Sequence, residues 1–162
     1  TIEGPFGSQL VAGGFFLNNE LTDFTFAPEK DGAPVANRVE GGKRPLSSMS
    51  PTIVYKDGKP VLALGSAGGR RIIMHVTKTL IGVLDFDLPL EQAIALPNIF
   101  FNDKALMLEL DRAPAGMHQQ LATFGRPVVN LDFPSKVNGA QMTDTGWVGS
   151  ADPRSPGTAF TE

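Results

Sequence analysis

The chain has 162 residues, of which 41% are hydrophobic and 19% charged, and its formal net charge is −3 at pH 7. This composition indicates a globular protein with a sizeable core; it excludes a disordered chain and gives no sign of a nucleic-acid or membrane-surface partner. Cysteine is absent, which excludes disulfides, a thiolate nucleophile and a cysteine-ligated metal, and no apolar run approaches the ~20 residues that a membrane span needs.

The first third of the chain predicts short strands and a long loop. Thr1 to Glu3 resemble the middle of a strand, so we expect a processed or incompletely represented chain. Residues 8–17 are apolar and are broken by Gly13-Gly14, which predicts two short strands around a turn. Residues 25–44 contain several prolines and glycines, and a loop of this length is usually functional or disordered.

The remaining two thirds predict hairpins and helices. Asp57-Gly58 separates two β-rich runs, which is a strong hairpin signal. Apolar residues at helical spacing predict a helix over residues 70–85 with one buried face. We expect further helices at 90–96 and 115–124, and strands at 105–110, 128–131, 141–142 and 147–150. Strand hairpins packed with a few helices indicate a layered α+β fold, with residues 1–162 forming a single domain.

A glycine-rich segment, Gly65-Ser-Ala-Gly-Gly69, stands between a predicted strand and the predicted helix. Glycine allows a close backbone approach and positive φ, and free N–H groups at a helix start attract negative charge. Two such N–H groups could form an oxyanion hole for acyl transfer. A Walker phosphate loop is excluded because no Gly-Lys-Ser/Thr follows. A plain strand-to-helix turn is the alternative.

Two polar segments could bind the ends of an amino acid. Ser47 and Ser48 stand between prolines, and both hydroxyls can reach one carboxylate if the backbone turns between them. Glu20 and Asp23 are three residues apart near aromatic side chains, and could hold a ligand ammonium through charge-assisted bonds. The alternatives are a solvated serine-rich loop and a turn capped by Asx side chains.

The two histidines offer little support for a catalytic or metal role. His75 lies near a helical face and His118 lies within a predicted helix. Neither has another histidine at metal-ligand spacing, and no Gly-x-Ser-x-Gly signature is present. We therefore expect structural or surface roles for both.

Taken in order, several stretches resemble the γ-glutamyltranspeptidase family. They cover nearly the whole chain: Thr1-Ile-Glu, Phe6-Gly-Ser, Phe16-Leu-Asn-Asn-Glu-Leu-Thr-Asp-Phe24, Lys43-Arg-Pro-Leu-Ser-Ser-Met-Ser-Pro51, Gly65-Ser-Ala-Gly-Gly69 with Arg71-Ile-Ile73, and Ala151-Asp-Pro-Arg154. Each is weak alone, but Lys-Arg-Pro-Leu-Ser-Ser-Met with a downstream Gly-Ser-x-Gly-Gly is specific. The resemblance implies an N-terminal nucleophile hydrolase with an αββα sandwich, of which this chain contributes a part.

The resemblance also implies how an acyl-enzyme would form. In this family a precursor cuts itself, and the new N-terminal threonine of the small subunit attacks the γ-glutamyl amide. That threonine belongs to a Thr-Thr-His-type segment upstream of the stretch that Thr1-Ile-Glu matches. Thr1 is therefore expected to orient the nucleophile, and the nucleophile segment itself is expected to be missing from this chain.

Further roles follow from the matched positions. Glu3, Glu20 and Asp23 match the residues that hold the substrate α-amino group. Ser47 and Ser48 match the pair that binds the α-carboxylate, and Gly68 and Gly69 match the N–H groups of the oxyanion hole. Residues 25–42 occupy the place of a lid that covers the pocket in some members, but they contain no tyrosine.

The resemblance implies a γ-glutamyl hydrolase or transferase that acts on glutathione and related compounds, without a cofactor or metal. The expected partners are a large subunit from the same precursor, which carries a carboxylate-binding arginine, and a small γ-glutamyl substrate. We expect a periplasmic or extracellular location. The alternatives are a glutaryl or cephalosporin-type acylase and a non-catalytic binding component. Because glutaryl lacks the α-amino group, the three acids favour glutamyl.

Overall fold

The computed structural model describes residues 7–130 and 136–160. Its backbone divides into two compact units, Thr1–Ser47 and Ser48–Glu162, which are considered separately below. The single domain expected from the sequence stays a prediction.

The first unit is built from small hairpins and one turn of 3-10 helix. Its elements are β1 (Val11–Ala12), β2 (Phe15–Phe16), η1 (Glu20–Asp23), β3 (Glu29–Lys30) and β4 (Ala33–Pro34). Gly13 and Gly14, both with positive φ, form the turn between β1 and β2, so the two strands expected within residues 8–17 are confirmed. Residues 25–42 contain the β3–β4 hairpin rather than an unstructured loop.

The second unit begins with the predicted hairpin. β5 (Thr52–Lys56) and β6 (Lys59–Gly65) pair antiparallel, with a register shift between Val54 and Tyr55. Asp57 and Gly58 have φ values of 51° and 76°, the positive pair that a two-residue type I′ turn requires. The twist of such a turn matches that of its flanking strands, which is why Asp-Gly specifies this connection.

A four-stranded antiparallel sheet in the order β11-β10-β6-β5 is the centre of the second unit. β10 (Asn138–Thr143) and β11 (Gly146–Ala151) complete it. Gly139 in β10 lies against β6, where an added Cβ would come within 2.6 Å of the Ala63 carbonyl oxygen. The two predicted strand pieces at 141–142 and 147–150 are thus parts of one hairpin.

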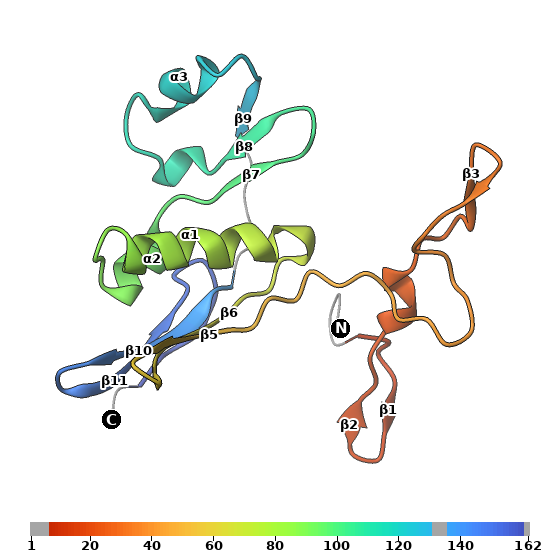
Figure 1. Cartoon of the computed structure of the whole chain (residues 1–162), viewed down its shortest axis with the longest axis horizontal. Coiled ribbons are helices and arrows are strands. Elements are labelled where there is room, and N and C mark those ends of the chain that lie inside the picture. The colour runs from red at the N-terminus through yellow and green to blue at the C-terminus, as the bar shows by residue number, and fades with distance from the viewer. Residues whose placement is uncertain (1–6, 131–135, 161–162) are drawn as a thin grey trace. The chain divides into compact units, whose positions relative to one another are not determined.

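Two helices pack on this sheet and form the core (Figure 1). The helix expected at 70–85 is α1 (Ile72–Leu84), and the helix expected at 90–96 is α2 (Leu90–Ala95). Gly82 of α1 lets the helices approach, because an added Cβ would lie 2.8 Å from the Cβ of Ala93. The buried cluster comprises Leu62, Leu64, Val83, Leu90, Ala93, Ile94 and Val137.

A second, three-stranded sheet follows in the order β7-β8-β9. β7 (Ile99–Phe101) pairs antiparallel with β8 (Leu106–Leu108), which pairs in parallel with β9 (Val128–Asn130). The connection from β8 to β9 contains η3 (Leu110–Arg112) and α3 (Met117–Ala122), the helix expected at 115–124. No helix among the described residues is long and apolar enough to cross a membrane.

Candidate functional site

Both candidate ammonium-binding acids of the first unit lie on η1. The Asn18 side-chain oxygen accepts the N–H of Glu20 at 3.0 Å, and the Thr22 hydroxyl donates to the Asn19 carbonyl at 2.8 Å. Glu20 and Asp23 are half-buried, and Phe24 after them is buried. An Asx turn at Asn18, related to the turn foreseen as an alternative, therefore leads into η1 and orders the backbone at Glu20, although the N-cap residue Asn19 makes no side-chain cap bond. Thr1 and Glu3 lie outside the described residues.

Asn37 connects this acidic turn to the segment that leads into the serine pair. Its side-chain amide donates to the Asp23 carbonyl at 2.8 Å, and its side-chain oxygen accepts the N–H of Leu46 at 2.8 Å. The Asn37 side chain thus connects the backbone at Asp23 to the backbone at Leu46, the residue before Ser47. The sequence analysis missed Asn37, because bonds across 14 and 9 residues have no local pattern.

The serine pair itself lies in irregular backbone where the two units meet along the chain. Ser47 is exposed and ends the first unit, whereas Ser48 is half-buried and begins the second. The Ser48 carbonyl accepts the Ser50 hydroxyl at 3.1 Å.

The lid-like segment, residues 25–42, is held by its own hydrogen bonds. Thr25 bridges to Arg38 across it, and the N–H of Thr25 donates to the Asn37 carbonyl at 2.8 Å. The half-buried Arg38 and the exposed Glu40 form an ion pair at 2.8 Å. These contacts give the segment a defined shape around the hairpin at its centre.

The glycine-rich segment joins β6 to α1, as expected. Gly68 and Gly69 have φ values of 139° and 58°, and η2 (Gly69–Arg71) follows directly. An added Cβ at Gly69 would meet nothing within 4 Å, so the backbone angle and not space requires glycine there. Among the described residues, neither the N–H of Gly68 nor that of Gly69 donates to a carbonyl. Two such donors at a helix start can stabilise an oxyanion.

Ser66 and His75 support this segment from the side of α1. The Ser66 hydroxyl donates to the Ala67 carbonyl at 3.0 Å and lies 3.3 Å from His75 Nδ1. Because the hydroxyl proton is used, Nδ1 is the donor of this pair. Burial, reinforced by the charge of Lys78, lowers the pKa of His75 to about 4. His75 is therefore a buried, neutral, structural histidine, as expected.

A buried polar network surrounds the end of α2. The Arg154 guanidinium donates to both Glu109 carboxylate oxygens, at 2.7 and 3.0 Å from Nε, and to Asp152 at 3.1 Å. It also donates to the Ile94 and Leu96 carbonyls, and Lys78 donates to the same two carbonyls. These cations occupy the negative end of α2.

The ionisation of this network follows from its contacts. Burial would raise the pKa of Glu109, but hydrogen bonds from Arg154 and from the Asn98 N–H outweigh it and hold that pKa below its usual value. Burial next to Arg154 lowers the pKa of Lys78 to about 8. The Ala151-Asp-Pro-Arg154 stretch therefore has a structural role, which sequence reasoning did not assign.

No group of three or more metal-binding side chains occurs within residues 7–130 and 136–160.

Comparison with known proteins identifies the family. The family model described as gamma-glutamyltranspeptidase matches residues 1–161. The glutathione hydrolase proenzyme of Bacillus subtilis (strain 168) is 40% identical over 127 residues, which are 77% of this chain and 21% of that protein. The glutathione hydrolase proenzyme of Pseudomonas aeruginosa is 43% identical over 154 residues, 91% of this chain and 26% of that protein. The chain thus spans about a quarter or less of these relatives.

A solved structure of a gamma-glutamyltranspeptidase supports the same family. The Helicobacter pylori gamma-glutamyltranspeptidase T380A mutant superposes with a TM-score of 0.81 at 36% identity, covering 96% of this chain and 90% of that one. The α+β, N-terminal nucleophile hydrolase fold expected from the sequence is confirmed, with this chain contributing part of the sandwich. The chain belongs to the γ-glutamyltranspeptidase family.

Proposed function

We propose that this chain is the small-subunit portion of an enzyme that cleaves the γ-glutamyl amide of glutathione and related compounds. The acyl group would pass to a threonine upstream of Thr1, then to water or to an amine. The full protein would comprise this portion and a large subunit from the same precursor, and would work in the periplasm or outside the cell. The proenzyme names of the relatives support a precursor that is cut into subunits.

The observation that carries the proposal is the Asn37 bridge between the acidic turn and the segment before the serine pair. Carboxylates of Glu20 and Asp23 suit an ammonium, whereas serine hydroxyls suit a carboxylate. A glutamate backbone carries these two groups on one carbon, so its two binding segments must be neighbours. Because one amide side chain, that of Asn37, bonds to both segments, the two segments are neighbours as such a site requires.

The remaining roles concern the reacting carbonyl. Gly68 and Gly69 would donate to the developing oxyanion, and Ser66 with His75 would keep their backbone in place. Thr1 would orient the attacking threonine, and Glu3 would join the acids at the substrate ammonium. Held at both ends of its backbone, the glutamyl group presents its γ-carbonyl in one orientation, which lowers the entropic part of the barrier.

The test is the variant Asp23→Ala in the full-length protein, assayed with γ-glutamyl-p-nitroanilide. Loss of one charge-assisted contact to the substrate ammonium is expected to lower kcat/KM roughly 10- to 100-fold. Asp111→Ala, at an exposed acid on η3, is the matched control and should keep wild-type kinetics. Thermal unfolding of both variants separates a folding defect from a binding defect. Unchanged kcat/KM in Asp23→Ala would reject the proposed site.

The same assay decides between the alternatives. A glutaryl anilide lacks the α-amino group, so the proposed enzyme should cleave it far more slowly than the γ-glutamyl anilide. Equal cleavage of both would indicate an acylase. No cleavage of either by the full-length protein would indicate a non-catalytic component.

A further inference from the structure

The two oxyanion donors proposed above belong to successive peptide units of the second unit. The Gly68 N–H is part of the Ala67–Gly68 peptide, and the Gly69 N–H is part of the Gly68–Gly69 peptide. Because both peptides are trans and planar, each N–H points away from the carbonyl of its own peptide. A group that binds the carbonyl from one side therefore sets the direction of the N–H on the other side.

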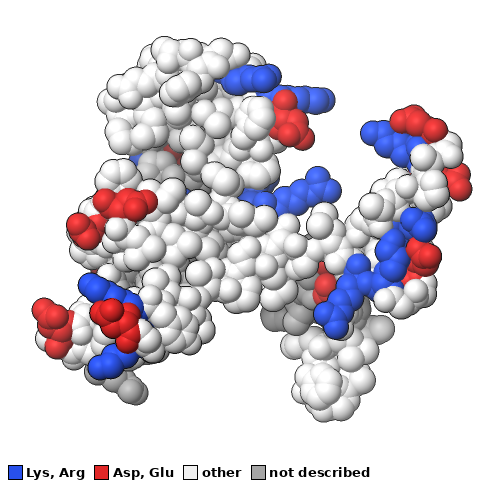
Figure 2. Space-filling model, in the orientation of Figure 1, with Lys and Arg blue, Asp and Glu red and all other residues white. Residues whose placement is uncertain are grey.

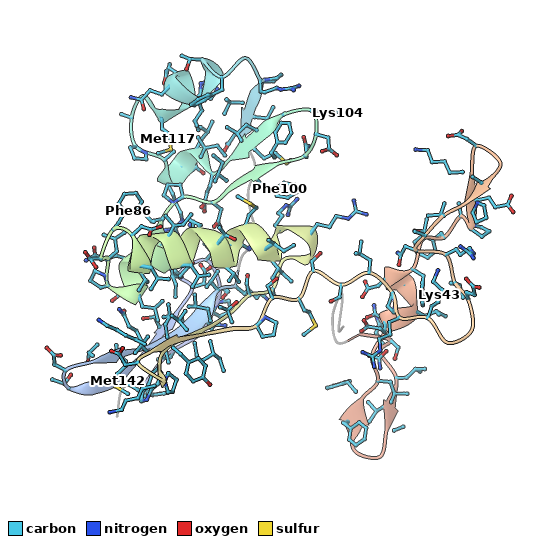
Figure 3. All side chains as sticks on the ribbon, in the orientation of Figure 1. Lys43, Phe86, Phe100, Lys104, Met117 and Met142 are labelled. Atoms are coloured by element: carbon cyan, nitrogen blue, oxygen red, sulfur yellow. The ribbon has the colours of Figure 1, made fainter. Side chains whose placement is uncertain are left out.

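The Gly68–Gly69 peptide is oriented by the backbone. Its carbonyl, that of Gly68, accepts the N–H of Arg71 at 3.3 Å within the turn of η2. This turn leads directly into α1, which in Figure 3 extends from a position near Phe100 toward Phe86, beyond its far end. The direction of the Gly69 N–H thus follows from regular helical structure.

The Ala67–Gly68 peptide has no such backbone support. Within the described residues, no backbone N–H donates to the Ala67 carbonyl, and Gly68, with a φ of 139°, leaves this peptide free to rotate. Arg70 and Arg71 directly precede α1, and Figure 2 shows positive charge at this end of the helix, which favours a negative oxygen there. A rotated peptide would present the Ala67 carbonyl oxygen to that negative oxygen and repel it.

Two side chains bind the Ala67 carbonyl instead. The Ser66 hydroxyl donates to it at 3.0 Å, and His75 Nδ1 lies 3.3 Å from the same hydroxyl oxygen. Burial lowers the pKa of His75, and a hydrogen bond with the Ala67 backbone partly opposes this effect by raising the pKa. Because only an acceptor favours the protonated ring, the atom that the ring contacts is the Ala67 carbonyl oxygen.

His75 occupies a fixed position from which to make these contacts. It is 1% exposed, and its own carbonyl accepts the Thr79 hydroxyl at 2.9 Å one turn along α1. Lys78 joins α1 to the end of α2 through the Ile94 and Leu96 carbonyls. The ring is therefore carried by a helix that is packed into the core and bonded to its neighbour.

We propose that Ser66 and His75 form a positioning pair that directs the Gly68 N–H toward the reacting carbonyl oxygen. His75 orients the Ser66 hydroxyl, and both side chains bind the Ala67 carbonyl on the opposite side of the peptide. This inference rests on the proposed function for the use of that N–H as an oxyanion donor. Neither side chain is assigned a substrate contact, so the pair acts on the transition state through the backbone alone.

The first experiment measures kcat and KM of the full-length protein with γ-glutamyl-p-nitroanilide. Ser66→Ala and His75→Leu are each expected to lower kcat about 10- to 100-fold and to change KM by less than about twofold, because an oxyanion donor acts in the transition state. His75→Asn, whose side-chain amide can donate from the place of Nδ1, should recover most of the kcat that His75→Leu loses. A change in KM with unchanged kcat would overturn the pair.

The double variant Ser66→Ala/His75→Leu tests whether the two residues act as one unit. Its kcat should be no lower than that of the more affected single variant, since either substitution alone releases the peptide. Losses that multiply would show that His75 acts independently of Ser66 and would overturn the pair.

Thr79→Val is the matched control, because it removes a buried hydroxyl that bonds to the His75 carbonyl and not to the glycine-rich segment. It should keep the wild-type kcat even where thermal unfolding shows a loss of stability. A loss of kcat equal to that of Ser66→Ala would assign the effect to a general weakening of α1 and would overturn the pair.

Crystal structures of the full-length wild type and of the double variant test the peptide without turnover. The Ala67 carbonyl should point toward Ser66 and His75 in the wild type, and the Ala67–Gly68 peptide should be rotated in the double variant. That result supports the pair even if the wild type cleaves no γ-glutamyl donor, in which case only the proposed function fails. An unrotated peptide in the double variant, or unchanged kcat in both single variants of an active enzyme, overturns the pair and leaves the proposed function standing.

Discussion

At the scale of single residues, His75 links the glycine-rich segment to the pH dependence of folding. It is 1% exposed, and its Nε2 has no hydrogen-bond partner within the described part of the chain. Burial lowers its pKa to about 4 in the folded chain, from 6.5. The unfolded chain therefore binds a proton between pH 6.5 and about 4 that the folded chain does not, and stability falls as pH falls through this window.

The predicted cost is about 3 kcal/mol in the free energy of unfolding by pH 4. His75→Gln removes the titrating group and keeps an amide for the Ser66 hydroxyl, so its stability should lose this part of the acid dependence. Urea unfolding of both proteins from pH 7 to pH 4 measures the difference in slope. Parallel curves for the wild type and the variant would show that His75 is not responsible.

At the scale of elements, Arg154 joins segments that are far apart in the chain. It binds Glu109 after β8 and the carbonyl groups at the end of α2, and its side chain is 5% exposed. Removing it leaves the Glu109 carboxylate without its principal partner in a buried place. Arg154→Ala is therefore expected to cost about 3–5 kcal/mol in the free energy of unfolding.

Arg112 is the matched control, because it pairs with the same carboxylate at 3.1 Å but is 38% exposed. Solvent screens an ion pair of this kind, and Arg112→Ala should cost about 1 kcal/mol or less. Chemical denaturation of the two variants gives both values. Equal losses would mean that the burial of Arg154 contributes nothing beyond its charge.

The elements that could be predicted from sequence are those with a local cause. The Asp57-Gly58 hairpin follows from the φ values of two neighbouring residues, and α1 follows from apolar residues one turn apart. β7 and the parallel pairing of β8 with β9 were missed, because their partners are set by tertiary packing. The Arg154 network was missed for the same reason, since its ends are 45 residues apart.

The residues of the candidate site also differ in whether a local sequence pattern identifies them. Glu20, Asp23 and the two glycines were found by residue type and by family resemblance, and the structure gives them an ordered turn and a strand-to-helix junction. Asn37 acts through hydrogen bonds to residues 14 and 9 positions away, so no pattern in its own neighbourhood identifies it. Whether the assigned residues bind substrate stays a prediction.

At the scale of the whole molecule, the apolar residues are distributed unevenly. The buried core cluster belongs entirely to the second unit. In the described part of the first unit, Phe24 is the buried hydrophobic residue, whereas Phe26, Leu21 and Phe15 are 89%, 69% and 67% exposed. Little apolar burial therefore opposes local opening of the first unit.

Limited proteolysis of this 162-residue chain tests whether the first unit opens more readily than the second. Trypsin should cut first after Lys30, Arg38 and Lys43 in the first unit, and should leave a resistant fragment that begins at Arg44. Lys78 is the internal reference, because it lies in α1 and its ammonium donates to two carbonyl groups at 2.9 and 2.7 Å. Local opening is enough to expose the first three sites, but cleavage at Lys78 requires the core of the second unit to unfold. Mass spectrometry of the fragments over time gives the order. Cleavage at Lys78 as early as at Lys30 would show that the two units unfold together.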